Sequence, residues 1–99
     1  MYDIIWSDKA VSNLKSIENY IAEESPIQAK KVINEIINYV EELFQFPHMG
    51  GVVPELNDCK LRQLIKYSYR IIYSVNKNQI NIITIIHSKQ DFTQRFRND

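Results

Sequence analysis

Arg70 and His87 are the side chains of this sequence whose types and placement best suit chemistry. We expect them on neighbouring antiparallel strands joined by a two-residue turn at 77–78. In that register, His87 lies opposite Ser68. Arg70 lies opposite Ile85, so it shares a face of the sheet with His87, roughly 7–8 Å away along the diagonal between backbones. A guanidinium and an imidazole so placed can jointly bind a phosphate or a carboxylate.

A structural interpretation of the same two residues stays open. Arg70 can instead be a partly buried arginine that pairs with Glu55 or Asp58, because a buried charge needs a partner. His87 can be a histidine at the end of a strand, with no chemical role. Neither residue type is specific on its own, so the sequence supports both interpretations.

Charge is divided between the two halves of the chain. Residues 50–99 carry eight basic and four acidic side chains, whereas residues 1–49 carry four basic and eight acidic ones. This division predicts an electrically polarised molecule whose positive side attracts nucleic acid or an acidic protein. Ordinary solvation of two charged surfaces would give the same counts, and this alternative stays open.

The cations expected to bind a target lie on a strand and in the tail that follows the last strand. They are Lys60, Arg62 and Lys66 on the strand 59–66, and Lys89, Arg95 and Arg97 in a C-terminal tail at about 89–99. The three cations of the strand share one of its faces, because side chains alternate. Whether Arg70 shares this face depends on the parity of the next turn, and both orientations stay open.

Two helices are expected to position these strands. A strand at 2–6 leads to the N-cap residue Ser7 and to a helix with the apolar residues Ala10, Val11, Leu14, Ile17 and Ile21. Ser25-Pro26 begins a second helix that runs to about Phe46, with an apolar stripe of Ala29, Val32, Ile33, Ile36, Ile37, Val40, Leu43 and Phe44. We expect Trp6, Tyr20 and Tyr39 to seal the helices against the sheet.

The second half of the chain changes to a strand pattern. After an irregular connection with Gly50-Gly51, β-branched and aromatic residues predict strands at 59–66, 68–76 and 79–87. The core face of the middle strand is expected to be Tyr69, Ile71, Tyr73 and Val75. The order β-α-α-β-β-β predicts an α+β fold, with two N-terminal helices packed on a small, mainly antiparallel sheet.

Length and composition limit the remaining possibilities. The 99 residues, 44% hydrophobic and 24% charged, predict one folded domain spanning 1–99. The single cysteine, Cys59, cannot form an internal disulfide, and neither a signal peptide nor a membrane-length apolar run is visible, so we expect a cytoplasmic protein without membrane contact. The histidines and the cysteine lack the spacing of a metal site, and we expect no metal and no cofactor.

Several short motifs occur in an order typical of one family. They are Trp6-Ser7-x-x-Ala10 with Leu14, Ile17 and Tyr20; Ser25-Pro26-x-x-Ala29; Leu43 with Pro47-x-x-Gly50; and Arg62, Tyr69-Arg70-Ile71-Ile72-Tyr73 and His87. Over roughly residues 2–92 the chain resembles the RelE/ParE superfamily of bacterial type II toxin–antitoxin toxins, nearest the ParE branch. The resemblance implies a growth-inhibiting cytoplasmic toxin that needs no cofactor and is held inactive by a cognate antitoxin, a segment of which wraps the toxin.

The resemblance offers two mechanisms. ParE-like members are associated with poisoning of DNA gyrase, whereas RelE-like members cut messenger RNA at the ribosome. Cutting RNA needs a base, an acid and cations near the phosphate. Glu55 occupies a place that resembles the catalytic glutamate of some RNA-cutting members, and Arg70 and His87 match the general positions of their arginine and histidine.

Other residues favour gyrase. Leu61 and Gln63 stand where RelE-type toxins alternate lysines, and no tyrosine follows Tyr73 to stack on a base. We therefore expect a toxin whose basic sheet face and tail contact gyrase, with enzyme activity left open. The alternatives are a metal-free, ribosome-dependent endoribonuclease that uses Arg70, His87 and Glu55, and a non-toxic module that only binds an antitoxin. The sequence does not indicate an oligomeric state.

Overall fold

Helices and strands follow one another in the order β-α-α-β-β-β-β. The computed structural model describes residues 2–56 and 60–88. Its elements are β1 (Asp3–Trp6), α1 (Asp8–Ala22), α2 (Pro26–Glu41), the 3₁₀ turn η1 (Glu42–Phe44), β2 (Gly51–Val52), β3 (Leu61–Lys66), β4 (Tyr69–Val75) and β5 (Gln79–His87). One sheet has the strand order β1-β5-β4-β3-β2, antiparallel except for the β1–β5 pair. The predicted α+β fold is confirmed, with β2 as an additional strand.

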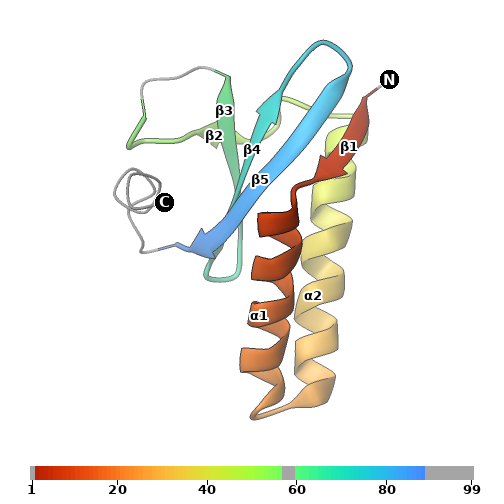
Figure 1. Cartoon of the computed structure of the whole chain (residues 1–99), viewed down its shortest axis with the longest axis vertical. Helices are drawn as coiled ribbons and strands as arrows, with labels where there is room; N and C mark the ends of the chain where they lie inside the picture. The colour runs from red at the N-terminus through yellow and green to blue at the C-terminus, as the bar shows by residue number, and fades with distance from the viewer. Residues whose placement is uncertain (1, 57–59, 89–99) are drawn as a thin grey trace.

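The α1–α2 hairpin lies against one face of the sheet, and its loop end extends beyond the sheet (Figure 1). We call this face the helix face and the opposite one the back face. Both helices begin where the sequence predicts. Ser7 Oγ accepts a hydrogen bond from Ala10 N–H at 3.0 Å, which caps α1. Ser25 Oγ accepts a hydrogen bond from Gln28 N–H at 3.1 Å, which caps α2.

The apolar stripe of α2 is confirmed except at Ile37, which is only partly buried, and at its end. Ala29, Val32, Ile33, Ile36 and Val40 are buried. Phe44, the last predicted member, is 42% exposed. The chain tightens into η1 after Glu41, and a 3₁₀ turn advances each side chain by about 120° instead of about 100°. This rotation carries Phe44 away from the sheet while Leu43 stays in the core.

A β-bulge interrupts the β4–β5 pair and changes its register. Close to the hairpin turn the register is the predicted one, with Val75 opposite Ile80. Beyond it, Tyr73 faces Ile82 but Ile72 faces Thr84, so Ile83 is an extra residue in β5. Every later residue of β5 is therefore shifted by one position relative to the expected pairing.

The start of α1 holds this bulge. Ser7 Oγ donates a hydrogen bond to the carbonyl oxygen of Ile83 at 2.7 Å. Asn13 Oδ1 accepts hydrogen bonds from Ile85 N–H at 3.1 Å and from Thr84 Oγ1 at 2.8 Å. The backbone groups that lose regular pairing at a bulge thus find partners on the helix, which satisfies them inside the protein.

Both faces of the sheet carry apolar clusters. On the helix face, the predicted core residues of β4 pack with α1 and α2, and Ile71 and Tyr73 are fully buried. On the back face, Val53 covers Ile72 and Ile86. The back face is therefore partly closed by the chain that follows β2, rather than open to a target.

Candidate functional site

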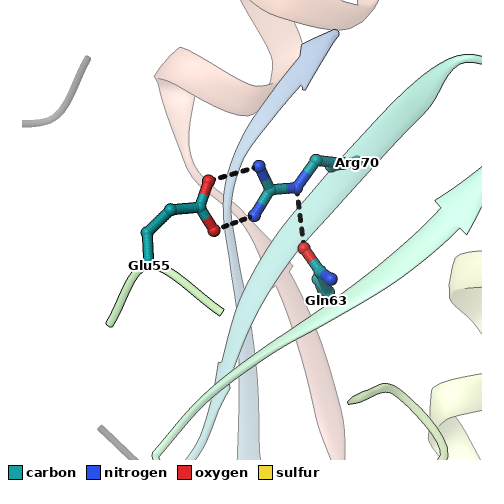
Figure 2. Close-up of polar contacts among 3 residues, drawn as sticks. All are labelled: Glu55, Gln63 and Arg70. Carbon is teal, nitrogen blue, oxygen red and sulfur yellow. Dashed lines mark hydrogen bonds and ion pairs between the residues drawn. The ribbon is translucent and has the colours of Figure 1, made fainter. Parts of the chain in front are cut away.

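Arg70 is bound by two side chains on the back face. Its guanidinium makes a two-pronged contact with the Glu55 carboxylate, Nη1 to Oε2 at 2.6 Å and Nη2 to Oε1 at 2.7 Å. Its Nε donates to Gln63 Oε1 at 2.7 Å, as Figure 2 shows. Arg70 is only 5% exposed. The interpretation of Arg70 as a buried arginine paired with Glu55 is confirmed.

These contacts make Arg70 a clasp for the segment that follows β2. Glu55 and Val53 lie on that segment, and Val53 is buried against the back face. A bidentate arginine–carboxylate pair fixes both the distance and the orientation of its partners. All three guanidinium nitrogens of Arg70 donate hydrogen bonds to side chains of this chain. In this arrangement Arg70 stabilises the fold, and its donors are not available to an incoming phosphate.

His87 lies on the other face of the sheet. It pairs with Tyr69, and the two rings meet edge to face with centroids 6.1 Å apart. Tyr69 packs on the helix-face core, and cross-strand partners point to the same side. The prediction that Arg70 and His87 share a face is therefore wrong. Its physical cause is the extra residue Ile83, since a one-residue slip inverts the orientation of a strand.

The basic residues of β3 also face away from Arg70. Arg62 and Lys66 are each two positions from Leu64, so they lie on the same face of β3 as this residue of the helix-face core. Arg62 Nη1 donates to the carbonyl oxygens of Gly50 at 2.7 Å and His48 at 3.2 Å. The single basic wall that the sequence suggested is thus divided between the two faces.

The other predicted target-binding cations lie in different surroundings. Lys66 Nζ is 3.9 Å from a carboxylate oxygen of Glu35 and 5.6 Å from the ring centres of both Tyr39 and Tyr67. Lys60 is exposed, just before β3. Lys89, Arg95 and Arg97 lie outside the described residues.

Tyr73 holds the connection between η1 and β2 through its hydroxyl, in addition to its predicted place in the core. Its hydroxyl donates to Pro47 O at 3.0 Å and accepts from Gly50 N–H at 3.0 Å. Burial raises the pKa of this hydroxyl, and the hydrogen bond from Gly50 and the charge of Arg62 oppose the rise. No local sequence signal could have found these contacts, because Tyr73 is far from both partners along the chain.

An open groove of about 600 Å³ lies between the helical hairpin and the β3–β4 turn. Its walls come from α1, α2, the β3–β4 turn, the start of β4 and the end of β5. The lining residues are Ser16, Ile17, Tyr20, Ile21, Gln28, Val32, Tyr67, Ser68, Tyr69 and His87. The prediction that Tyr20 seals the core is wrong, because Tyr20 is 72% exposed. It lies near the end of α1, where the hairpin extends beyond the sheet (Figure 1).

The fold and the groove define a class of small α+β proteins in which a helical hairpin covers one face of a mostly antiparallel sheet. Residues 4–92 match the family described as the ParE toxin of the type II toxin–antitoxin system, parDE. The chain belongs to this ParE toxin family. The predicted kinship with the RelE/ParE toxins is confirmed.

The chain is also similar to individual proteins, in sequence or in fold. The chain is 27% identical over 89 residues to the toxin RelE2 of Caulobacter vibrioides, covering 89% of this chain and 97% of the relative. Its fold is similar to a chain of a chromosomal ParDE system from P. aeruginosa, with a TM-score of 0.74, 24% identity, and coverage of 90% of this chain and 98% of that one. A YoeB–YefM complex from Staphylococcus aureus shares the fold at a TM-score of 0.55, with 18% identity over 88% of this chain and 97% of that one.

Within residues 2–56 and 60–88, no helix is both long and apolar enough to cross a membrane.

Proposed function

We propose that this ParE-family toxin inhibits bacterial growth by poisoning DNA gyrase, without cutting RNA, and that a cognate antitoxin neutralises it. The observation that carries the proposal is the placement of Arg70 and His87 on opposite faces of the sheet, in a chain of the ParE family. ParE-like toxins, which this chain resembles, are associated with poisoning of DNA gyrase.

RNA cleavage by attack of the 2′-hydroxyl needs a base, an acid and a cation around one phosphate. Here Glu55 and Arg70 bind each other, and the sheet separates both from His87. A phosphate held by Arg70 would first have to displace the Glu55 carboxylate. The three groups therefore lack a common reacting centre in this arrangement.

A ribosome-dependent endoribonuclease remains the second candidate, because one observation favours it. Glu55 and Arg70, the glutamate and arginine that the resemblance assigns to catalysis, are in direct contact at 2.6 Å. In this version, the clasp opens on the ribosome, with Glu55 as the base and Arg70 as the clamp on the phosphate.

We propose that the antitoxin binds in the groove between the helical hairpin and the β3–β4 turn. The solved structures with this fold include toxin–antitoxin complexes, which supports a protein partner of that kind. Ile17, Ile21 and Val32 provide apolar walls, and an amphipathic helix places a matching apolar face in such a groove.

We assign the contact with gyrase to exposed or C-terminal basic residues of the second half of the sequence. Lys60 and the tail cations Lys89, Arg95 and Arg97 belong to this set. Arg62 and Lys66 belong to the same proposed set, and each also contacts groups of this chain.

Three measurements test the proposal together. Controlled expression should arrest growth, and co-expression of the protein encoded by the adjacent reading frame should restore it. Purified chain should inhibit supercoiling by gyrase and should leave messenger RNA intact on translating ribosomes. RNA cuts that Arg70→Ala abolishes would instead support the endoribonuclease. Normal growth and normal supercoiling would indicate a non-toxic antitoxin-binding module.

A further inference from the structure

The β3–β4 turn holds a tyrosine where the backbone favours glycine. Lys66 pairs with Tyr69, so the turn consists of two residues, Tyr67 and Ser68. Tyr67 has φ 56° and, among residues 2–56 and 60–88, is the one non-glycine residue with positive φ. A two-residue hairpin with positive φ at its first position alone is a type II′ turn, in which glycine is preferred there. A bulky residue at positive φ is a genuine outlier and carries strain.

The contacts of Tyr67 within the chain do not explain why a tyrosine, rather than a glycine, occupies this turn position. Its side chain is large and apolar, yet the residue is 47% exposed. Its ring lies 5.6 Å from Lys66 Nζ, and its hydroxyl donates to the Glu35 carboxylate, which raises the pKa of Tyr67. Cation–π and hydrogen-bond contacts at an exposed site contribute little to stability. Backbone outliers that the fold does not need are concentrated at binding sites.

Tyr67 stands at the wall of the groove. It lines the hollow with Tyr69 and His87 on the sheet side, and Tyr20 lines it on the helix side. A tyrosine held by its turn presents a broad apolar ring and a polar tip with only two side-chain torsions to fix. Residues of this type dominate the affinity of protein interfaces.

We propose that Tyr67 is a principal affinity determinant for the partner that fills the groove, retained at a cost to the stability of the free chain. The inference rests on the proposed function, since the partner is the apolar face of an amphipathic segment of the cognate antitoxin. A second copy of this chain fits less well. A two-fold contact would place one groove against the same groove of the copy, and two hollows do not fill each other.

The test separates folding from binding with two substitutions of one residue. Tyr67→Gly removes the ring and relieves the backbone, whereas Tyr67→Ala removes the ring and keeps the strain. Phe46→Ala is the matched control, because Phe46 is an aromatic residue, 58% exposed, that does not line the groove. The probe is the purified protein encoded by the adjacent reading frame. The readouts are the thermal midpoint of each free variant and its dissociation constant with the probe.

We expect Tyr67→Gly to unfold at or above the wild-type midpoint and several degrees above Tyr67→Ala. Both should bind the probe about tenfold more weakly or worse, while Phe46→Ala stays within about twofold. Wild-type affinity in a folded Tyr67→Gly overturns the inference and leaves the proposed function standing. A thermal midpoint of Tyr67→Gly below that of Tyr67→Ala would mean that the backbone at residue 67 is not strained, and this result also overturns the inference. Concentration-dependent self-association lost in Tyr67→Gly assigns the groove to a second copy.

A probe that does not bind the wild-type chain is a different result, because it contradicts the proposed antitoxin itself. Failure of the inference and failure of the proposed function are therefore distinguishable in one titration series.

Discussion

Gly50 occupies a position where a side chain does not fit, and this gives a prediction at the residue scale. A Cβ built on Gly50 lies 2.5 Å from Tyr73 Oη and 2.6 Å from the carbonyl oxygen of Gln63, whereas one on Gly51 meets no described atom within 4 Å. Gly50→Ala should lower the free energy of unfolding by about 1–3 kcal/mol, since overpacking forces its neighbours to move. Gly51→Ala is the adjacent control and should change it by less than about 0.5 kcal/mol. Urea denaturation measures both, and equal midpoints would contradict the close packing at Gly50.

The hydroxyl of Tyr73 gives a second residue-scale prediction, through pH. Burial holds its pKa above the model-peptide value of 10.0 in the folded chain. Below pH 10 the hydroxyl is protonated in both states, so it adds no pH dependence. Above pH 10 the unfolded chain releases this proton first, and the free energy of unfolding falls as pH rises.

Tyr73→Phe should remove the contribution of this hydroxyl to the fall in the free energy of unfolding above pH 10. It should also cost about 1–3 kcal/mol at neutral pH, because the buried Gly50 N–H loses its acceptor. Comparing denaturation of wild type and variant from pH 9 to 11 isolates the contribution, since other titrating groups are common to both. Parallel pH profiles would show that Tyr73 does not titrate differently in the two states.

At the scale of elements, the bulge in β5 depends on α1. Asn13→Ala leaves Ile85 N–H and the Thr84 hydroxyl without their acceptor, and should lower the free energy of unfolding by about 1–2 kcal/mol. Hydrogen exchange at the Ile85 amide should become faster, because the bulge loses its anchor. Asn19→Ala, at an exposed position of the same helix, is the matched control. Unchanged exchange at Ile85 would mean that the strands alone hold the bulge.

The same bulge marks the limit of what the sequence predicts about the elements. Both caps, the helices and four of the five strands follow from local patterns, since N-cap residues, apolar spacing and β-branched runs act within a few residues. The predicted register also holds beside the β4–β5 turn, where local geometry decides it. The bulge at Ile83 is held by the hydrogen bonds of Ser7 with Ile83 and of Asn13 with Ile85, and each of these pairs is more than seventy positions apart along the chain. No pattern within β5 encodes that contact.

At the scale of the whole molecule, the bulge in β5 changes the candidate site, because the register of β4 and β5 decides which side chains share a face. The sequence correctly suggested the pairing of Arg70 with Glu55 as an alternative, from the rule that buried charges are paired. It could not place His87 on the opposite face, or show that Tyr20 and Tyr67 line one groove. Those arrangements require the helical hairpin, the bulge and the turn to be assembled together.

The Arg70–Glu55 clasp allows fold and function to be separated in the whole molecule. Glu55→Leu alone leaves the Arg70 guanidinium, on a side chain that is 7% exposed, without its carboxylate, and should lower the free energy of unfolding by about 3 kcal/mol or more. The double variant Arg70→Met with Glu55→Leu replaces both charges by apolar groups of similar size and should recover most of that loss. Urea denaturation of the four proteins of this cycle measures the coupling between the two side chains.

If Arg70 serves the fold and the toxin acts on gyrase, the folded double variant should still arrest growth and inhibit supercoiling about as strongly as the wild type. If Arg70 and Glu55 instead act on RNA, the double variant should be folded but inactive, because neither a base nor a phosphate clamp remains. Growth arrest measured at matched levels of folded protein therefore distinguishes the two functions. The distinction holds because a pair replaced as a unit removes the chemistry without leaving a buried charge unpaired.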